Sequence, residues 1–331
     1  MNKIIYKVLD AVICSIAFVQ FAGAQELYAT QTQKEKDCEV EEFTAICVAD
    51  NFQVSLQEGA CGVKLLSDEA LLPYLLVSVR DSVLYLEYDE KSVPRDVKKL
   101  YRGKNAPVPV LKAIVSSPFL NGITATQNAV IRGNSTVFSD ALDVTVTDKA
   151  TIKNLVLDAE SAKLHMSKNG TADFSLTAES QLELSLEGSS QLKLQYKSHN
   201  LLLHQEGNST AILQGESSTA TFAVSGYAKN RCTGKGGVLV VEAGGGSDIS
   251  LAGEMGDLTL TLERTAKVDA LEMKASRVKV SQNGWNSATV HAEDFLSVSL
   301  TGGSTLHYSG IPAIQVDKIM KSSLVHIEDS K

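Results

Sequence analysis

A short polar turn that returns after 19 residues is the feature that most constrains how this chain can fold. Glu160-Ser161 returns as Glu179-Ser180, and Gly188-Ser189 returns as Gly207-Asn208. Looser versions of the same turn start at Asn134, Asn169, Gly246 and Gly303. A return of about 20 residues is the length of one coil in a β-solenoid, where successive coils stack on one another.

Short segments of alternating apolar and polar residues lie between these turns. Examples are residues 155–157, 182–186, 192–194, 258–262 and 278–280. Such alternation gives a strand one buried and one solvated face. The connections are too short for the helices that join parallel strands in α/β proteins, and the 19-residue return favours a β-helix over a sandwich. We expect an all-β, right-handed parallel β-helix with its coils and a C-terminal cap over residues 130–327.

The region before the coils, residues 43–129, has the pattern of antiparallel hairpins. Residues 52–56 and 62–66 alternate on either side of Glu58-Gly59-Ala60, and residues 76–79 and 83–88 flank a second turn. Both pairs are typical of β-hairpins. Pro109 predicts that the strand around residues 108–115 starts nearby or lies at an edge.

The first 24 residues have the features of a secretory signal peptide. A basic start with Lys3 and Lys7 precedes an apolar run over 11–21 and the sequence Ala22-Gly23-Ala24. This run is too short to span a membrane. We therefore predict an exported protein of the periplasm or cell surface, with a polar lead-in over 25–42 and no transmembrane segment after cleavage.

Charge and cysteine usage exclude some partners. The formal net charge is −8 without a Lys/Arg stripe, so binding to nucleic acid is not expected. Four cysteines follow the signal peptide, and Cys47 and Cys61 lie in segments that could pair as neighbouring strands. Export permits a disulfide, but the spacing leaves its formation open. The sequence does not indicate the oligomeric state.

The candidate catalytic residues do not form a convincing set. Asp148, Asp158 and Asp173 could serve a glycan-cleaving β-helix, which needs clustered carboxylates, but their spacing favours different faces. His199 and His204 are five residues apart, which places them on opposite faces of a strand. We expect no enzyme activity, no cofactor and no metal site.

Two stretches offer candidate binding residues. Trp285 is the only tryptophan, and with Asn283 it could stack on and hydrogen-bond to a sugar; it could also cover the core at a corner. Lys229 and Arg231 belong to a basic, glycine-rich segment over 227–246, which predicts an irregular loop suited to binding. Its glycines could instead serve simply to turn corners.

An ordered set of segments over residues 43–327 resembles the DUF2807 family of autotransporter adhesin head (GIN) domains from Bacteroidetes. The segments are 43–56, 83–88, 110–123 and the closing Gly-Ile-Pro within 302–312. The resemblance implies an exported β-helical protein and carries over no ligand residues.

Three functions remain open from the sequence. The leading one is a binding or adhesin-like protein of the cell envelope, with a glycan or an envelope protein as its partner. The second is a periplasmic structural protein without a ligand, and the third is a glycan-active enzyme.

Overall fold

The computed structural model of this chain describes residues 33–104, 106–133 and 135–328. The predicted signal peptide, residues 1–24, lies outside them. The first strands are β1 (Gln33–Cys38), β2 (Ala45–Val48), β3 (Gln53–Gln57), β4 (Gly62–Asp68), β5 (Leu75–Arg80), β6 (Val83–Tyr88), β7 (Leu111–Ser116), β8 (Gly122–Ala125) and β9 (Val130–Gly133). Short helical segments are η2 (Leu72–Tyr74), η3 (Glu90–Ser92) and α2 (Arg95–Leu100).

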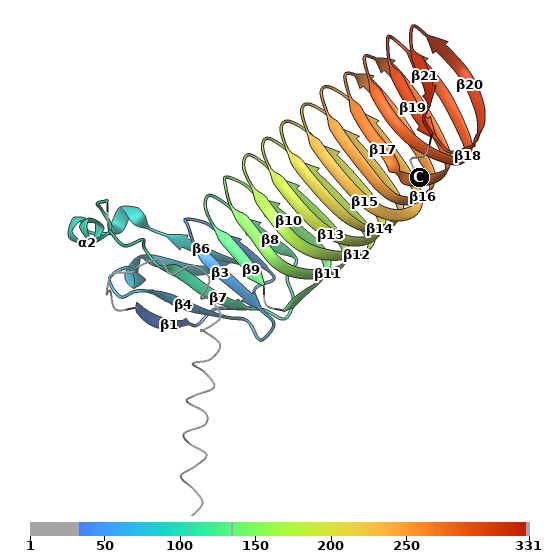
Figure 1. Cartoon of the computed structure of the whole chain (residues 1–331). Helices are drawn as coiled ribbons and strands as arrows, with labels where there is room; N and C mark the ends of the chain where they lie inside the picture. Colours follow the sequence, from blue (N-terminus) through green and yellow to red (C-terminus); the bar gives the residue numbers. More distant parts are fainter. Residues whose placement is uncertain (1–32, 105, 134, 329–331) are drawn as a thin grey trace, which may run out of the picture.

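Long strands follow and form most of the molecule. They are β10 (Thr136–Val146), β11 (Thr151–Met166), β12 (Thr171–Leu186), β13 (Gln191–Gln205), β14 (Thr210–Val224), β15 (Lys229–Ala243), β16 (Asp248–Arg264), β17 (Lys267–Gly284) and β18 (Ser287–Thr301). The last strands are β19 (Thr305–Ser309), β20 (Ala313–Met320) and β21 (Ser323–His326). Figure 1 shows them stacked into a rod, with β1, β4, β7 and α2 gathered at one end.

Each long strand covers two sides of the solenoid because its inward side changes at a bend. In β13, Leu192 and Leu194 point into the core, and beyond the bend Leu201 and Leu203 do so. His199, which is exposed, and Asn200, which is half-buried, lie between the two series and shift the alternation by one residue. The short strands predicted from the sequence are therefore halves of longer, bent strands.

The coils pair in parallel and align apolar residues into columns. Leu164 lies opposite Leu184, and Leu182 lies opposite Leu201, so the 19-residue return does place like on like. These four side chains are almost fully buried. The predicted all-β solenoid is confirmed.

The turns between coils repeat one backbone conformation. A residue with positive φ occupies the same place in each turn, and members of this series are Gln127, Asp148, Lys168, Gly188, Gly207, Gly226, Gly245, Arg264 and Gly284. At Gly207 a Cβ would lie 2.7 Å from the carbonyl oxygen of Gly188 in the coil before. Glycine there provides both the left-handed conformation and room for the neighbouring backbone.

The N-terminal region confirms one predicted hairpin and corrects the other. β5 and β6 pair antiparallel around Asp81 and Ser82, as expected. β3 and β4 do not pair with each other, because β7 lies between them, parallel to β3 and antiparallel to β4. β7 begins two residues after Pro109, so this proline removes no hydrogen bond from the strand.

The irregular loop predicted over residues 227–246 is wrong, because β15 runs through it without a break. Its glycines make room inside the solenoid for Tyr196, which is buried two coils away. A Cβ on Gly234 would lie 3.4 Å from the Tyr196 hydroxyl oxygen, and one on Gly215 only 1.9 Å from the Tyr196 carbonyl oxygen. The glycines reflect close packing and not a change of direction.

The four cysteines in the described part of the chain are free thiols. The Sγ atom of Cys61 lies 3.7 Å from the carbonyl oxygen of Phe43. Cys47 lies on β2, opposite Tyr85 on one side and Thr124 on the other. The structure therefore contains no bridge between Cys47 and Cys61.

The C-terminal residues continue the solenoid and do not form the expected cap. β20 pairs in parallel with β18, and β21 pairs in parallel with β19. All eight residues of β20 are exposed. Residues 313–328 therefore add a further coil whose inner side is open to solvent.

Candidate binding ridge

The structure places two exposed aromatic rings on one edge of the solenoid. We call this edge the turn ridge; it consists of residues 226–227, 245–246, 264–265, 284–285 and 302–303. The side chains of Tyr227 and Trp285 are 74% and 77% exposed, among the most exposed large apolar side chains described. Exposed aromatic rings of this size commonly mark interaction sites.

Tyr227 and Trp285 occupy equivalent positions in their turns. The backbone N–H of Tyr227 donates to the Gly207 carbonyl at 2.8 Å, and that of Trp285 donates to the Arg264 carbonyl at 2.6 Å. Each ring therefore follows the left-handed residue of its turn. Three coil steps separate the two turns, and with a strand spacing of about 4.8 Å they lie about 14 Å apart along the ridge.

Each ring lies against a glycine of the next coil. A Cβ on Gly246 would be 3.0 Å from two atoms of the Tyr227 ring, and one on Gly303 would be 3.3 Å from two atoms of the Trp285 ring. The glycines thus let both rings lie close to the backbone. Rings supported in this way present a rigid apolar surface that loses little conformational freedom when a ligand binds.

Polar groups accompany the rings. Thr265 lies in a turn between them, and its hydroxyl donates to the Gly245 carbonyl at 2.7 Å. Asn283 is exposed beside Trp285, and its side-chain oxygen accepts a hydrogen bond from the Thr301 hydroxyl at 3.2 Å. Arg264, also exposed, lies in the same turn as Thr265. The ridge can therefore combine stacking with hydrogen bonds.

The four residues singled out from the sequence fall into two groups. Trp285 and Asn283 lie together at one turn. Lys229 and Arg231 are exposed on the first half of β15, directly after Tyr227. Lys229 lies opposite Asp248 of the next coil, and three coil steps separate it from Ser287, which follows Trp285 closely in the chain. The structure does not bring all four side chains to one point.

Tyr227 is the residue that the sequence argument missed. The signal was present, since Gly226-Tyr227 and Gly284-Trp285 are the same glycine–aromatic pair. Assigning residues 227–246 to an irregular loop concealed that these pairs occupy the same turn position.

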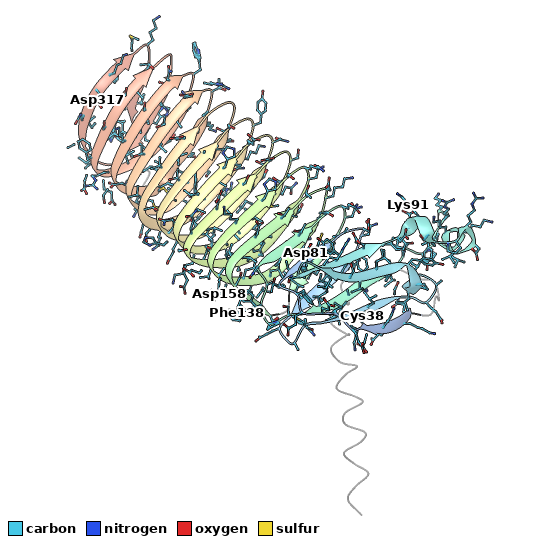
Figure 2. The ribbon with its side chains drawn as sticks, turned by 180° about the vertical axis from the view of Figure 1, so that it is seen from behind. Cys38, Asp81, Lys91, Phe138, Asp158 and Asp317 are labelled. Carbon is cyan, nitrogen blue, oxygen red and sulfur yellow. The ribbon has the colours of Figure 1, made fainter. Side chains whose placement is uncertain are left out.

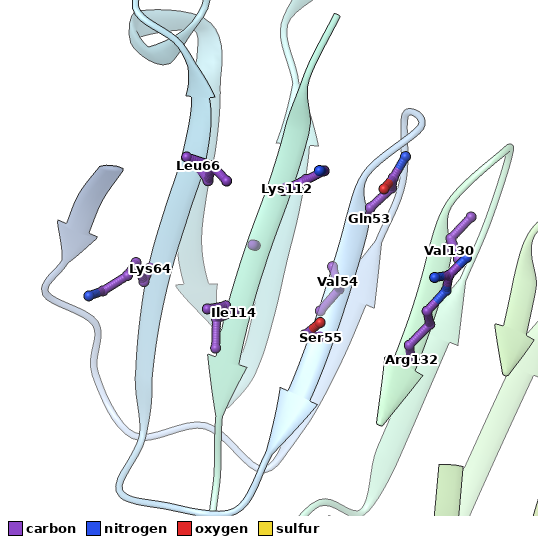
Figure 3. Close-up of a pocket in the computed structure, with 10 residues that line it drawn as sticks. Gln53, Val54, Ser55, Lys64, Leu66, Lys112, Ile114, Val130 and Arg132 are labelled. Carbon is purple, nitrogen blue, oxygen red and sulfur yellow. The ribbon is translucent and has the colours of Figure 1, made fainter. Parts of the chain in front are cut away.

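The hollow shown in Figure 3 is too small to serve as a ligand pocket. It lies on the outer face of β4, β7, β3 and β9, where Leu66, Ile114 and Val130 adjoin Lys112 and Arg132. Its volume is about 20 Å³, enough for about one water molecule.

A larger groove of about 490 Å³ follows the bend of the coils. Lys197, Glu216, Lys235 and Glu254 lie opposite one another on successive strands along it. The Nζ atom of Lys235 is 3.2 Å from a carboxylate oxygen of Glu254. The alternating charges largely neutralise each other, so the groove has no net attraction for a charged ligand.

The carboxylates considered for catalysis are dispersed. Asp148 forms an ion pair with Lys168 in the turns, and Asp173 lies 3.3 Å from Lys193 on the first half of the coils. Asp158 lies opposite Thr177 near the bend and is visible in Figure 2 beside Phe138. Within residues 33–328, gaps excepted, no group of three or more His, Cys, Asp or Glu side chains is placed to hold a metal ion.

The helices described for this chain include none that is long and apolar enough to cross a membrane.

Comparison with known proteins identifies a family. The family model DUF2807, described as "Putative auto-transporter adhesin, head GIN domain", matches residues 42–181 and 231–312. No curated protein matches the chain.

Solved structures of low sequence identity are also similar. A "putative adhesin" from Parabacteroides merdae ATCC 43184 is 18% identical, covers 92% of this chain and 100% of its own, and has a TM-score of 0.38. A "Putative lipid binding protein" from Parabacteroides distasonis ATCC 8503 is 12% identical, with 89% and 96% covered and a TM-score of 0.35. A "putative adhesin" from Bacteroides fragilis NCTC 9343 is 16% identical, with 91% and 100% covered and a TM-score of 0.28. TM-scores this low carry no argument about function.

Proposed function

This chain belongs to the DUF2807 family, and from that premise we propose that it is an exported, non-enzymatic binding protein that holds a carbohydrate chain along its turn ridge. The observation that carries the proposal is the pair of exposed rings of Tyr227 and Trp285, each lying against a glycine of the next coil. The family description names an adhesin, which agrees with a binding role at the cell envelope.

The chemistry of the ridge suits a sugar chain better than a compact ligand. An aromatic ring offers an apolar face of the kind that can pack against the C–H groups of a sugar ring, while the polar groups beside it satisfy hydroxyls. Two such rings about 14 Å apart on a straight edge suit an extended molecule that touches both. Lys229 and Arg231, beside Tyr227, add positive charge for an acidic sugar at that end.

A binding role also agrees with the placement of the carboxylates. Glycosidic bond cleavage ordinarily needs two carboxyl groups within about 10 Å across one bond. Asp148 and Asp173 are each engaged with a lysine, and Asp158 lies on another part of the coil. The ridge itself carries no such pair among its described residues.

Trp285 supplies a direct test because it is the only tryptophan of the chain. A glycan array first identifies ligands, and titration with those oligosaccharides is then followed by tryptophan fluorescence. Binding over Trp285 should shift the emission to shorter wavelength as the indole leaves water. Tyr227→Ala keeps this reporter and should weaken the Kd about tenfold or more, as removal of a central aromatic contact typically does.

Leu202→Ala is the matched control, because Leu202 is an exposed apolar residue away from the ridge. It should leave the affinity unchanged. An array without hits, with a protein partner recovered instead, would turn the ridge into a protein-binding surface; no partner of either kind would favour a structural role. Binding that survives both Tyr227→Ala and Trp285→Ala rules out the ridge.

Location requires a separate experiment. Protease added to intact cells should cleave the protein if it faces outward. Protection until the outer membrane is opened would place it in the periplasm and limit its partners to periplasmic molecules.

A further inference from the structure

The far end of the solenoid has an unpaired strand edge. β20 pairs with β18 on one side, and among the described residues no strand pairs with its other side. Its outward-facing backbone N–H and C=O groups are available to a further strand. Figure 2 shows Asp317 of this strand at the end of the rod opposite to Lys91 and Cys38.

The inward side chains of β20 continue the core columns without being covered. Ile314 lies opposite Leu296, Val316 opposite Val298, and Ile319 opposite Leu300. The three residues on β18 are 0% exposed, whereas Ile314, Val316 and Ile319 are 42%, 51% and 41% exposed. The exposed set is therefore a cross-section of the core.

The other end of the solenoid is closed. Leu65 and Leu84, on the strands near that end, are 0% exposed, and Leu71 and Val93 from the helical connections are buried with them. The edge strand β1 carries alternating charges, which discourage strand addition; they are Lys34, Glu35, Lys36 and Asp37. Head-to-tail stacking of two copies would therefore bring an open core against a closed, charged end.

We propose that the open end binds a second copy of this chain, with β20 of each copy pairing across a twofold axis. A twofold axis makes a strand antiparallel to its own copy, which is a favourable sheet pairing. Because the opposite ends are closed, the contact yields a discrete dimer and not a filament. Each copy supplies the cap that the other lacks.

The sequence of β20 fits this self-pairing in one register. A bulge at Asp317 shifts the alternation, so that Val316 and Ile319 both point inward and Lys318 points outward. An axis between residues 317 and 318 sets Val316 of one copy opposite Ile319 of the other. It also sets Asp317 opposite Lys318, in both directions. Apolar and charged residues are thus self-complementary in the same alignment.

Sedimentation velocity of the purified full chain over a range of concentrations tests the proposal. The wild-type protein should reversibly form a dimer and nothing larger. Val316→Lys should be monomeric throughout. Asp317→Lys and Lys318→Asp should each weaken the dimer at least about tenfold, because like charges then meet across the axis. The double variant Asp317→Lys/Lys318→Asp restores opposite charges and should dimerise close to wild type.

Leu202→Lys is the matched control, since Leu202 is 41% exposed on a strand remote from the end. It should remain dimeric, and circular dichroism should show all variants folded. A wild-type protein that stays monomeric at every concentration overturns the proposal, as does growth without limit. A dimer that is unaffected by Val316→Lys places the contact elsewhere and overturns it too.

Discussion

Inside the solenoid, the side-chain amide of Asn230 donates a hydrogen bond of 3.0 Å to the side-chain oxygen of Gln205 in a neighbouring coil. Gln205 in turn donates to the carbonyl oxygens of Lys229 and Ser209, at 2.9 and 3.1 Å. Both side chains are buried. These bonds join two coils within the core, where an unpaired amide is costly.

Gln205→Leu should therefore destabilise the protein by about 1–3 kcal/mol, because it leaves the Asn230 amide without its acceptor. Gln205→Leu combined with Asn230→Ala should cost less than the sum of the single changes, since the second removes the stranded group. Urea unfolding measures both. Additive losses would mean that the two side chains do not depend on each other.

Gly207→Ala should destabilise the chain by at least about 1–2 kcal/mol from backbone conformation alone. The φ angle of Gly207 is +75°, and the added Cβ would also meet the Gly188 carbonyl oxygen at 2.7 Å. Gly244→Ala is the control, because a Cβ there meets nothing within 4 Å. Thermal unfolding should separate the variants; equal melting temperatures would contradict the ladder of left-handed turns.

The Cys232 thiol should make the fold sensitive to alkali. Burial raises the pKa of Cys232 to about 11, although a hydrogen bond with Tyr196 opposes the shift. The unfolded thiol loses its proton near its ordinary pKa of about 8.5, so stability is constant below that pH and falls as pH rises toward the folded pKa. Unfolding midpoints across this window should fall more steeply for wild type than for Cys232→Ala.

Alkylation gives an independent check on the same thiol. Iodoacetamide should leave Cys232 unmodified in the native protein near neutral pH and modify it after unfolding, as mass spectrometry would show. Rapid native modification would contradict its burial.

Asp257 should titrate below the usual range of an aspartate. Its carboxylate accepts hydrogen bonds from Arg277, including one of 2.7 Å from Nη2, and these lower its pKa. The stabilisation is present above the ordinary pKa of about 3.9 and is lost as pH falls through the lower folded value. Carbon-13 NMR of the carboxyl group should show that Arg277→Lys raises this pKa, because lysine cannot form the two-pronged contact. Arg231→Lys should leave it unchanged.

The coil architecture could be predicted because alternation and return act together. Leu182 and Leu201 are 19 residues apart and both follow a polar turn, so the sequence alone indicates that they stack. The bend in β13 could not be predicted in the same way. His199 and Asn200 interrupt the alternation, as a loop would, yet the backbone pairs on both sides of them.

Neighbours along the chain misled the interpretation at the N-terminal end. The turn at Glu58-Gly59-Ala60 suggested that β3 and β4 pair directly, but β7 has the same alternation and takes the place between them. Similarly, Gly234 and Gly236 suggested a bend, although both lie within the continuous strand β15. Composition does not distinguish a glycine that turns the chain from one that makes room for Tyr196.

Half of the candidate ridge could be predicted. Trp285 stood out by its rarity, whereas Tyr227 is one of nine tyrosines and gains meaning only when the turns are superposed. Asn283 belongs to the Trp285 turn, and Lys229 and Arg231 belong to the other ring, a grouping that depends on the number of coils between them.

The equal steps of the coils make this molecule a ruler. The separation of Tyr227 and Trp285 is a count of three steps, and each step is added or removed as one block of about 20 residues without disturbing the strands on either side. Deleting residues 246–264 would join one turn to the next at an equivalent place and bring the rings one step closer. Among proteins built in this way, a ligand of different length can be matched by gaining or losing whole coils, with every contact residue left unchanged.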